Sequence, residues 1–345
     1  MTASGHRQVL LALTISLIFG VGGFLAGLPL PWMLGPMIGN TLAAMLGLPI
    51  KGPDRMRPIV IPVIGVMLGS SVTVALFAQL TGWIPTLVLL PVFLMCAAGT
   101  SYAAYRKIGG YDPVTAFYAA MPGGLNEMLI MGGEAGGDEK RIALAHAARV
   151  LIVILFVVLF FGLFLGVNST GTAGWVALDD LSISDYAILG FCAVAGVYLG
   201  RWLRLPAAPV FGPMILSAVA HIAEWVIVSP PTIMIITAQI VIGTVIGSRF
   251  VGVKATDIAR DLSLAVVASV GMLIFAVLFA LVIVAISGMS LSQAFLAYSP
   301  GGLTEMALLT LAMDQDVTYV SVLHLIRITL VIAIAPLLFR LTRSR

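Results

Sequence analysis

Long apolar runs alternate with short polar segments along the whole of this 345-residue chain. Most runs contain about 20 residues, the length that an α-helix needs to cross the hydrocarbon core of a bilayer. No polar segment is long enough to form a separate water-soluble domain. We therefore predict membrane-spanning helices near residues 8–28, 30–48, 58–80, 84–105, 142–166, 184–200, 207–228, 231–250, 262–287 and 317–340.

The composition supports this interpretation. The chain is 60% hydrophobic and only 10% charged, and its mean hydropathy of +1.11 excludes an ordinary soluble domain. The formal charge of +3 comes without a basic patch on a soluble unit, so we expect no direct contact with nucleic acid. Cys96 and Cys192 lie in apolar runs without metal-binding spacing, which is typical of small buried residues. The first apolar run is too long for a signal peptide.

Two segments that break helices interrupt the pattern, at 112–135 and 291–313, and their central sequences match at an offset of 178 residues. A Pro-Gly-Gly step ends a helix and frees backbone polar groups. Inside a bilayer such groups, and a nearby carboxylate, are tolerated only where protein or a hydrated cavity satisfies them. We predict that these segments bind a solute through Pro122, Gly123, Gly124, Asn126, Glu127, Pro300, Gly301, Gly302, Thr304 and Glu305.

The duplication extends well beyond these segments. Gly-Pro-Met-Ile occurs at 35–38 and at 212–215, and the pair His146 and Arg149 returns as His324 and Arg327. We therefore divide the chain into a first membrane repeat at 1–166, a second at 184–342, and a linker at 167–183.

The positive charges predict the topology. If each broken segment enters the membrane and returns on the same side, sixteen of the eighteen Lys and Arg residues, all but Arg149 and Arg327, face one side. The positive-inside rule makes this side cytoplasmic, together with both termini, and we expect a multi-pass protein of an inner (cytoplasmic) membrane. Each half then crosses five times, so the second half is inverted relative to the first. Inverted repeats with broken helices are typical of secondary transporters.

The paired His and Arg residues point to the middle of the membrane. Arg149 follows Asp138 by 11 residues, which places it roughly 16 Å along its helix. Two interpretations remain open. In the first, Arg149 and Arg327 form buried ion pairs with Glu127 and Glu305 that only hold the broken segments. In the second, these groups line a shared polar cavity, where the amides after the glycines hold an anionic group and His146 and His324 hydrogen-bond or carry protons.

The repeated Gly-Pro-Met-Ile and Pro-Gly-Gly-Leu-x-Glu-Met blocks, followed by His-x-x-Arg, resemble the bacterial membrane AbrB family over nearly the whole chain. Members of that family carry the name of a regulator of gene expression, and some were named as ammonia monooxygenases. The small soluble DNA-binding AbrB proteins are a different group, which this chain does not resemble. The resemblance brings no established substrate, cofactor or catalytic residue with it.

These observations predict an all-α polytopic membrane protein with two inverted repeats, each of about five transmembrane helices and one re-entrant segment. We expect a transporter-like carrier of an unknown small polar solute, with protons as the candidate coupling ion. We expect no enzymatic activity and no cofactor. The partners are the lipid bilayer and the solute, and a homodimer is left open. One alternative is a membrane regulator that acts indirectly on gene expression. A metal-dependent monooxygenase is disfavoured, because its only ligands, His146, His324, Glu127 and Glu305, lie beside two arginines.

Overall fold

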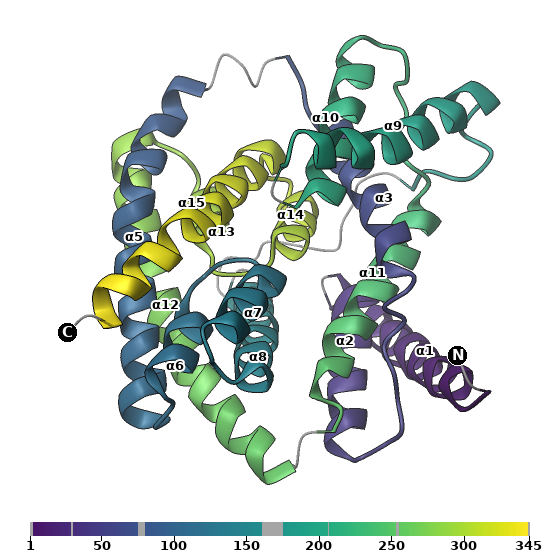
Figure 1. The fold of residues 1–345 in the computed structure, drawn as a ribbon. Coiled ribbons are helices and arrows are strands. Elements are labelled where there is room, and N and C mark those ends of the chain that lie inside the picture. Colours follow the sequence, from purple (N-terminus) through teal and green to yellow (C-terminus); the bar gives the residue numbers. More distant parts are fainter. Residues whose placement is uncertain are drawn as a thin grey trace. The chain divides into compact units, whose positions relative to one another are not determined.

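A computed structural model describes residues 3–28, 30–74, 80–160, 175–205, 207–252 and 255–343. Within these ranges the chain forms fourteen α-helices and no β-strand, so the predicted all-α class is confirmed (Figure 1). Parts of the predicted runs at 58–80 and 142–166 and of the linker at 167–183 lie outside the described residues.

The helices occur in the same order in the two halves of the chain. The first half contains α1 (Ala3–Leu25), α2 (Pro31–Met45), α3 (Arg57–Ser70), α5 (Ile84–Ala103), α6 (Pro113–Ala120), α7 (Leu125–Glu134) and α8 (Glu139–Leu159). The second half contains α9 (Ile183–Trp202), α10 (Ala208–Ile222), α11 (Thr232–Gly247), α12 (Ala255–Ser287), α13 (Leu291–Tyr298), α14 (Leu303–Ala312) and α15 (Val317–Arg343). The short helices η1 (Leu80–Trp83) and η2 (Ala104–Ile108) extend the two ends of α5, and η4 (Ser248–Phe250) extends α11.

Six helices of the described part are long and apolar enough to cross a membrane, judged by length and composition, and they correspond to six of the ten spans predicted. The helices α2, α3 and α10 contain only 15, 14 and 15 residues. Residues with left-handed backbone, Gly47 after α2 and Glu224 after α10, stop two of them early. The six long spans are Gly5–Leu25, Thr81–Ile108, Ile183–Trp202, Thr232–Phe250, Arg260–Ser287 and Val317–Phe339.

The chain folds into two compact units, and each unit takes helices from both sequence halves. The first unit comprises Met1–Leu80, Asn168–Gly252 and Ala307–Thr318, and it contains α1–α3 and α9–α11. The second unit comprises Thr81–Val167, Val253–Met306 and Tyr319–Arg345, and it contains α5–α8, α12, α13 and most of α15. The compact units therefore do not coincide with the two predicted repeats.

In the first unit, equivalent helices of the two halves exchange equivalent contacts. A Cβ added at Gly65 of α3 would overlap the carbonyl oxygen of Val210 in α10. A Cβ added at Gly243 of α11 would overlap the carbonyl oxygen of Met33 in α2. Because Gly65 matches Gly243 and Met33 matches Val210 in the duplicated sequence, the two crossings are related as in a two-fold interface.

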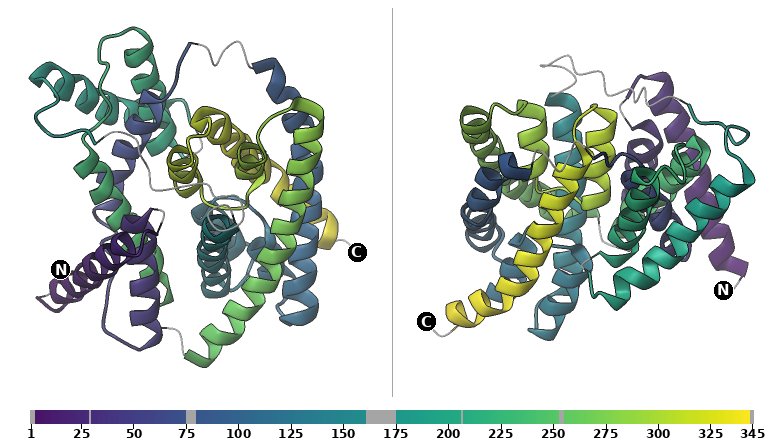
Figure 2. Two further views of the ribbon diagram at one scale, coloured as in Figure 1. Left: turned by 180° about the vertical axis from the view of Figure 1, so that it is seen from behind. Right: turned by 90° about the horizontal axis from the view of Figure 1, so that it is seen from above.

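The second unit is built around long helices from each half. Helix α12 packs along α5 and also contacts α8 and α13 (Figure 2). The short helices α6 and α7 pack on α8 and on each other. This arrangement places both Pro-Gly-Gly steps, at 122–124 and 300–302, in the second unit, whereas α14 (Leu303–Ala312) is divided between the two units after Met306.

Candidate functional site

Each Pro-Gly-Gly segment separates two short helices. Helix α6 ends at Ala120 and α7 begins at Leu125, while α13 ends at Tyr298 and α14 begins at Leu303. Pro122 and Pro300 are both buried in the breaks. All the predicted site residues belong to the second unit, so the fold brings the two breaks into one body.

A carboxylate folds back over the start of the second short helix at each break. The Oε2 atom of Glu127 occupies the space that a Cβ of Gly124 would need, and Glu305 does the same at Gly302. Gly124 is the N-cap of α7, so the carboxylate lies at the positive end of the helix dipole. Glu305 is 7% exposed, whereas Glu127 is half-buried. The chain's own carboxylates thus lie at the helix starts where we predicted an anionic group.

The first short helix of the first break ends against a buried guanidinium. Arg149, which is 4% exposed, donates from Nη1 to the carbonyl oxygens of Ala119 (3.4 Å) and Met121 (3.2 Å). Its Nη2 donates to Nδ1 of His146 at 2.7 Å. The Nε2 atom of the same imidazole lies 2.9 Å from the carbonyl oxygen of Tyr118. We call these contacts the first carbonyl clamp.

The second break has an equivalent group, the second carbonyl clamp. Arg327 is 2% exposed and donates from Nη1 to the Ser299 carbonyl and from Nη2 to the Gly301 carbonyl, the latter at 2.7 Å. Its Nη2 lies 3.5 Å from Nδ1 of His324. Nε2 of His324 lies 2.9 Å from the carbonyl oxygen of Leu296. The imidazole contacts therefore recur at matching positions of the two halves.

The predicted Glu–Arg ion pairs are not formed, and this part of the first interpretation is wrong. Neither Arg149 with Glu127 nor Arg327 with Glu305 forms an ion pair in the described part of the chain. The reason is electrostatic. Each half-helix has a negative carbonyl end and a positive amide end. The guanidinium donates to carbonyls at the end of the first short helix, and the carboxylate lies at the amide end of the second, so each charge meets the oppositely charged end of a half-helix instead of the other side chain.

The hydrogen bonds assign a tautomer to the two imidazoles. In His146 and His324 the Nδ1 atom faces an arginine, which can only donate, so Nδ1 accepts. The Nε2 atom faces a backbone carbonyl and therefore carries the hydrogen. A second proton on Nδ1 would point at the guanidinium hydrogens. In this arrangement each histidine is neutral and fixes the orientation of its arginine.

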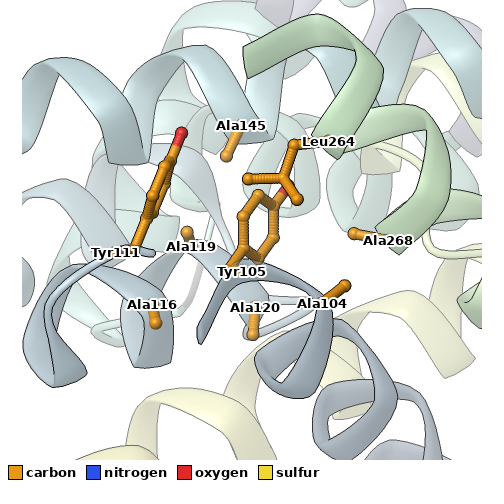
Figure 3. Packing of buried hydrophobic residues seen from close by; sticks show 9 residues of the cluster. All are labelled: Ala104, Tyr105, Tyr111, Ala116, Ala119, Ala120, Ala145, Leu264 and Ala268. Carbon is orange, nitrogen blue, oxygen red and sulfur yellow. The ribbon is translucent and has the colours of Figure 1, made fainter. Parts of the chain in front are cut away.

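Aromatic and alanine side chains pack together at the first break. Ala116, Ala119 and Ala120 of α6 pack around the stacked rings of Tyr105 and Tyr111, whose centroids lie 5.3 Å apart (Figure 3). The small side chains of α6 let it approach its neighbours closely. This cluster was not predicted from the sequence, although the recurring alanines just before the Pro-Gly-Gly step were a visible signal.

Helices of one half also pack against the break of the other half. Phe117 and Tyr118 of α6 contact Phe339 of α15, with centroids 5.3 and 5.5 Å apart. Phe156 of α8 contacts Phe295 of α13 at 5.9 Å. Aromatic contacts therefore join the two halves at both breaks.

The two breaks differ in polarity. Ser299 is fully buried in the second break, and its Oγ has no hydrogen-bond partner within the described ranges. The matching residue of the first break is the apolar Met121. Thr304 is half-buried, while the side chain of Asn126 lies outside the described part. Among the described residues, no three His, Cys, Asp or Glu side chains lie together in a way that could hold a metal ion.

The fold and the two clamps define an all-helical, multi-pass membrane type of protein with paired broken helices. The chain belongs to the AbrB family, whose model is described as "Transition state regulatory protein AbrB" and matches residues 32–343. The resemblance predicted from the motifs is thereby confirmed.

Two curated relatives match along almost their full length. "Uncharacterized protein YhjN" of Bacillus subtilis (strain 168) is 26% identical over 354 residues, which cover 94% of this chain and 91% of the relative. "Putative regulator AbrB" of Escherichia coli (strain K12) is 25% identical over 330 residues, which cover 94% of each chain.

Proposed function

We propose that this chain is a carrier that moves a small polar solute across the bacterial inner membrane, with its solute site at the two Pro-Gly-Gly breaks. The observation that carries the proposal is the gathering of both breaks in one compact unit, each with a carboxylate at one helix end and a guanidinium at the other. Charged groups at membrane depth are costly and are typical of transport pathways.

The helices α6–α7 and α13–α14 form re-entrant segments in this proposal. At 1.5 Å per residue, helices of 8 and 10 residues are about 12 and 15 Å long, well short of a hydrocarbon core of about 30 Å. Both termini and the Lys- and Arg-rich loops then face the cytoplasm. The exchanged contacts of α3 with α10 and of α11 with α2 support a two-fold relation between the halves, as inverted repeats require.

Glu127 and Glu305 are the proposed coupling groups. Each carboxylate lies at the amide end of α7 or α14, where negative charge is stabilised. Protonation removes that attraction and frees the amides for an acidic or polar group of the solute. His146 and His324 are less suited to this role, because their two nitrogens are already engaged in the clamps.

A ligand screen tests the proposal. Purified protein in detergent is heated with amino acids, organic acids, ammonium, polyamines, sugars and metal ions, and the melting temperature is recorded. A ligand that binds the folded state raises this temperature by mass action. We expect a ligand whose effect disappears in the Glu127→Gln, Glu305→Gln double variant, and whose flux into proteoliposomes is lost in the same variant. Identical melting-temperature shifts and equal flux in the wild-type protein and the double variant would contradict the assignment of the solute site to the two breaks.

A membrane regulator is the second candidate, because the Escherichia coli relative is named a putative regulator and the family model carries a regulatory description. Such a role would act on gene expression through a protein partner or through the transported solute. Deletion of the gene, followed by measurement of transcript levels, distinguishes regulation that depends on transport from regulation that acts through a protein partner. If the double Glu variant restores the transcripts as well as the wild-type chain does, regulation does not depend on transport.

A further inference from the structure

We propose that Arg149 and Arg327 are built-in cations, which fill the positions at the ends of α6 and α13 where a broken helix would otherwise bind a metal cation such as Na⁺. On this view they are positioning residues that fix the two breaks. Their role does not depend on which solute the protein carries.

The chemistry of a broken helix explains why a cation is needed. The last carbonyl groups of a helix have no partners within it and carry the negative end of its dipole. Within a bilayer such groups must be satisfied by protein or by water. In broken membrane helices, unwound carbonyls of this kind coordinate Na⁺. The carbonyls of Ala119 and Met121 and those of Ser299 and Gly301 are of this kind, and here all four accept from guanidinium groups.

A guanidinium suits this position better than an ammonium group would. It is planar, always charged and carries five donors in fixed directions, so one arginine serves several carbonyls at once. The adjacent imidazole fixes its plane, because His146 and His324 each accept from the arginine and donate to a further carbonyl. Both arginines are almost fully buried and have no carboxylate partner among the described residues.

The same device occurs at both breaks. The arginines are 178 residues apart, and so are Met121 and Ser299, whose carbonyl oxygens accept from them. A chance polar contact would not be expected to recur with its histidine and its acceptor at matching positions. Each break therefore carries its own permanent positive charge at the carbonyl end.

Chemical rescue tests the proposal. We replace the arginine by Arg327→Ala and measure the melting temperature in detergent, without any solute, at constant ionic strength. The variant should melt well below the wild-type protein. Low millimolar guanidinium or methylguanidinium should raise the melting temperature of the variant in a saturable way by occupying the vacated position. The same additives should leave the wild-type melting temperature unchanged or slightly lower.

Arg141→Ala is the matched control. This arginine lies in α8, but its side chain is 46% exposed, pairs with Asp138 at the helix start and lies over the Tyr111 ring, 4.9 Å from the ring centroid. We expect a small loss of stability and no rescue. Equal effects of guanidinium on Arg327→Ala, Arg141→Ala and the wild-type protein would overturn the proposal.

Two further variants keep the test decisive if Arg327→Ala does not fold. Arg327→Lys retains a positive charge, whereas Arg327→Gln retains hydrogen-bond donors without charge. The Lys variant should melt closer to the wild-type protein than the Gln variant, and the reverse order would contradict a cation requirement.

The wild-type melting temperature should be the same in sodium chloride and in choline chloride. A saturable, Na⁺-specific rise in the wild-type protein would show that the cation position is not already filled.

Discussion

At the scale of single residues, the sequence identified the charged groups at the breaks but not their partners. Glu127, Glu305, Arg149 and Arg327 stood out because charges are rare in apolar runs. Their expected mutual pairing was wrong, since the arginines bind backbone carbonyls. Every residue has a backbone carbonyl group, so the residue types in a sequence do not indicate which carbonyl accepts a hydrogen bond from an arginine. The folding of the carboxylates over Gly124 and Gly302 was equally hidden.

The glycine before α14 should be sensitive to a single methyl group. In Gly302→Ala the new Cβ would overlap Oε2 of Glu305 and displace the carboxylate from the helix start. We expect a loss of about 0.5–1 kcal/mol in the free energy of unfolding, the usual size of a charge–dipole contact. The measurement is the melting temperature in detergent. Gly99→Ala in α5 is the control, because a Cβ there meets nothing within 4 Å. Equal melting temperatures for the two variants would argue against the carboxylate position.

At the scale of elements, helix positions were predicted well and helix ends less well. Apolar runs and the Pro-Gly-Gly steps located the helices on both sides of each break. The lengths of α2 and α10 were overestimated, because the apolar sequence continues past the left-handed residues Gly47 and Glu224 that end them. Hydropathy does not report backbone conformation, and Glu224 in particular has no preference for such a turn.

The crossing of α3 and α10 depends on a glycine. In Gly65→Ala the Cβ would overlap the carbonyl oxygen of Val210, and because this atom belongs to the backbone, the helices must move apart. We expect destabilisation of about 1–3 kcal/mol, as for other overpacked interiors. Thermal unfolding followed by circular dichroism measures it. Gly190→Ala in α9 provides the comparison, since its Cβ meets no atom within 4 Å. A Gly65→Ala protein as stable as this control would contradict the close approach.

The start of α6 should depend on pH. The Asp112 carboxylate accepts from the amides of Val114 (3.0 Å) and Thr115 (2.9 Å), and it lies outside the six long spans. Partial burial acts to raise the pKa of Asp112, but the hydrogen bonds from Thr115 and Val114 outweigh it and hold the pKa below 3.8. The folded pKa is depressed, so the stabilisation is present above the unfolded pKa and disappears as the pH falls through the folded pKa.

Substitution of Asp112 makes this dependence measurable. At neutral pH, Asp112→Ala should be less stable than the wild-type protein by about 1 kcal/mol, the usual value of an N-cap. The difference should shrink as the pH falls below 3.8. Asp112→Asn keeps a cap without a titrating group, so its stability relative to Asp112→Ala should not change over this range. The test is to compare the melting temperatures of the three proteins between pH 7 and the lowest pH at which the protein stays folded.

At the scale of the whole molecule, the duplication was visible in the sequence but the division into units was not. Matching motifs reveal which segments are equivalent, whereas packing decides which segments fold together. The second unit combines α5–α8 with α12, α13 and most of α15, so it cuts across both repeats. The packing of α12 on α5 and α8, together with contacts such as those of Phe117 with Phe339 and of Phe156 with Phe295, establishes that combination.

The proposed inversion places equivalent loops on opposite faces of the membrane. The loop after α2 contains Lys51 and the matching loop after α10 contains Glu224, and both residues are exposed. After Cys96 and Cys192 are replaced by Ala, single cysteines are introduced as Lys51→Cys and Glu224→Cys. A membrane-impermeant maleimide should label Glu224→Cys in spheroplasts with an intact inner membrane, and Lys51→Cys only after that membrane is permeabilised. Labelling of both from the same side would exclude the inverted arrangement.

The order in which the chain is synthesised gives the carbonyl clamps a further consequence. Each clamp joins residues that are at most 30 positions apart, so it lies wholly within one half of the chain. By contrast, neither compact unit is complete until helices of the second half have left the ribosome. The first break can therefore enter the bilayer with its carbonyls already satisfied, while its later packing partners, such as α12 and α15, are still being made.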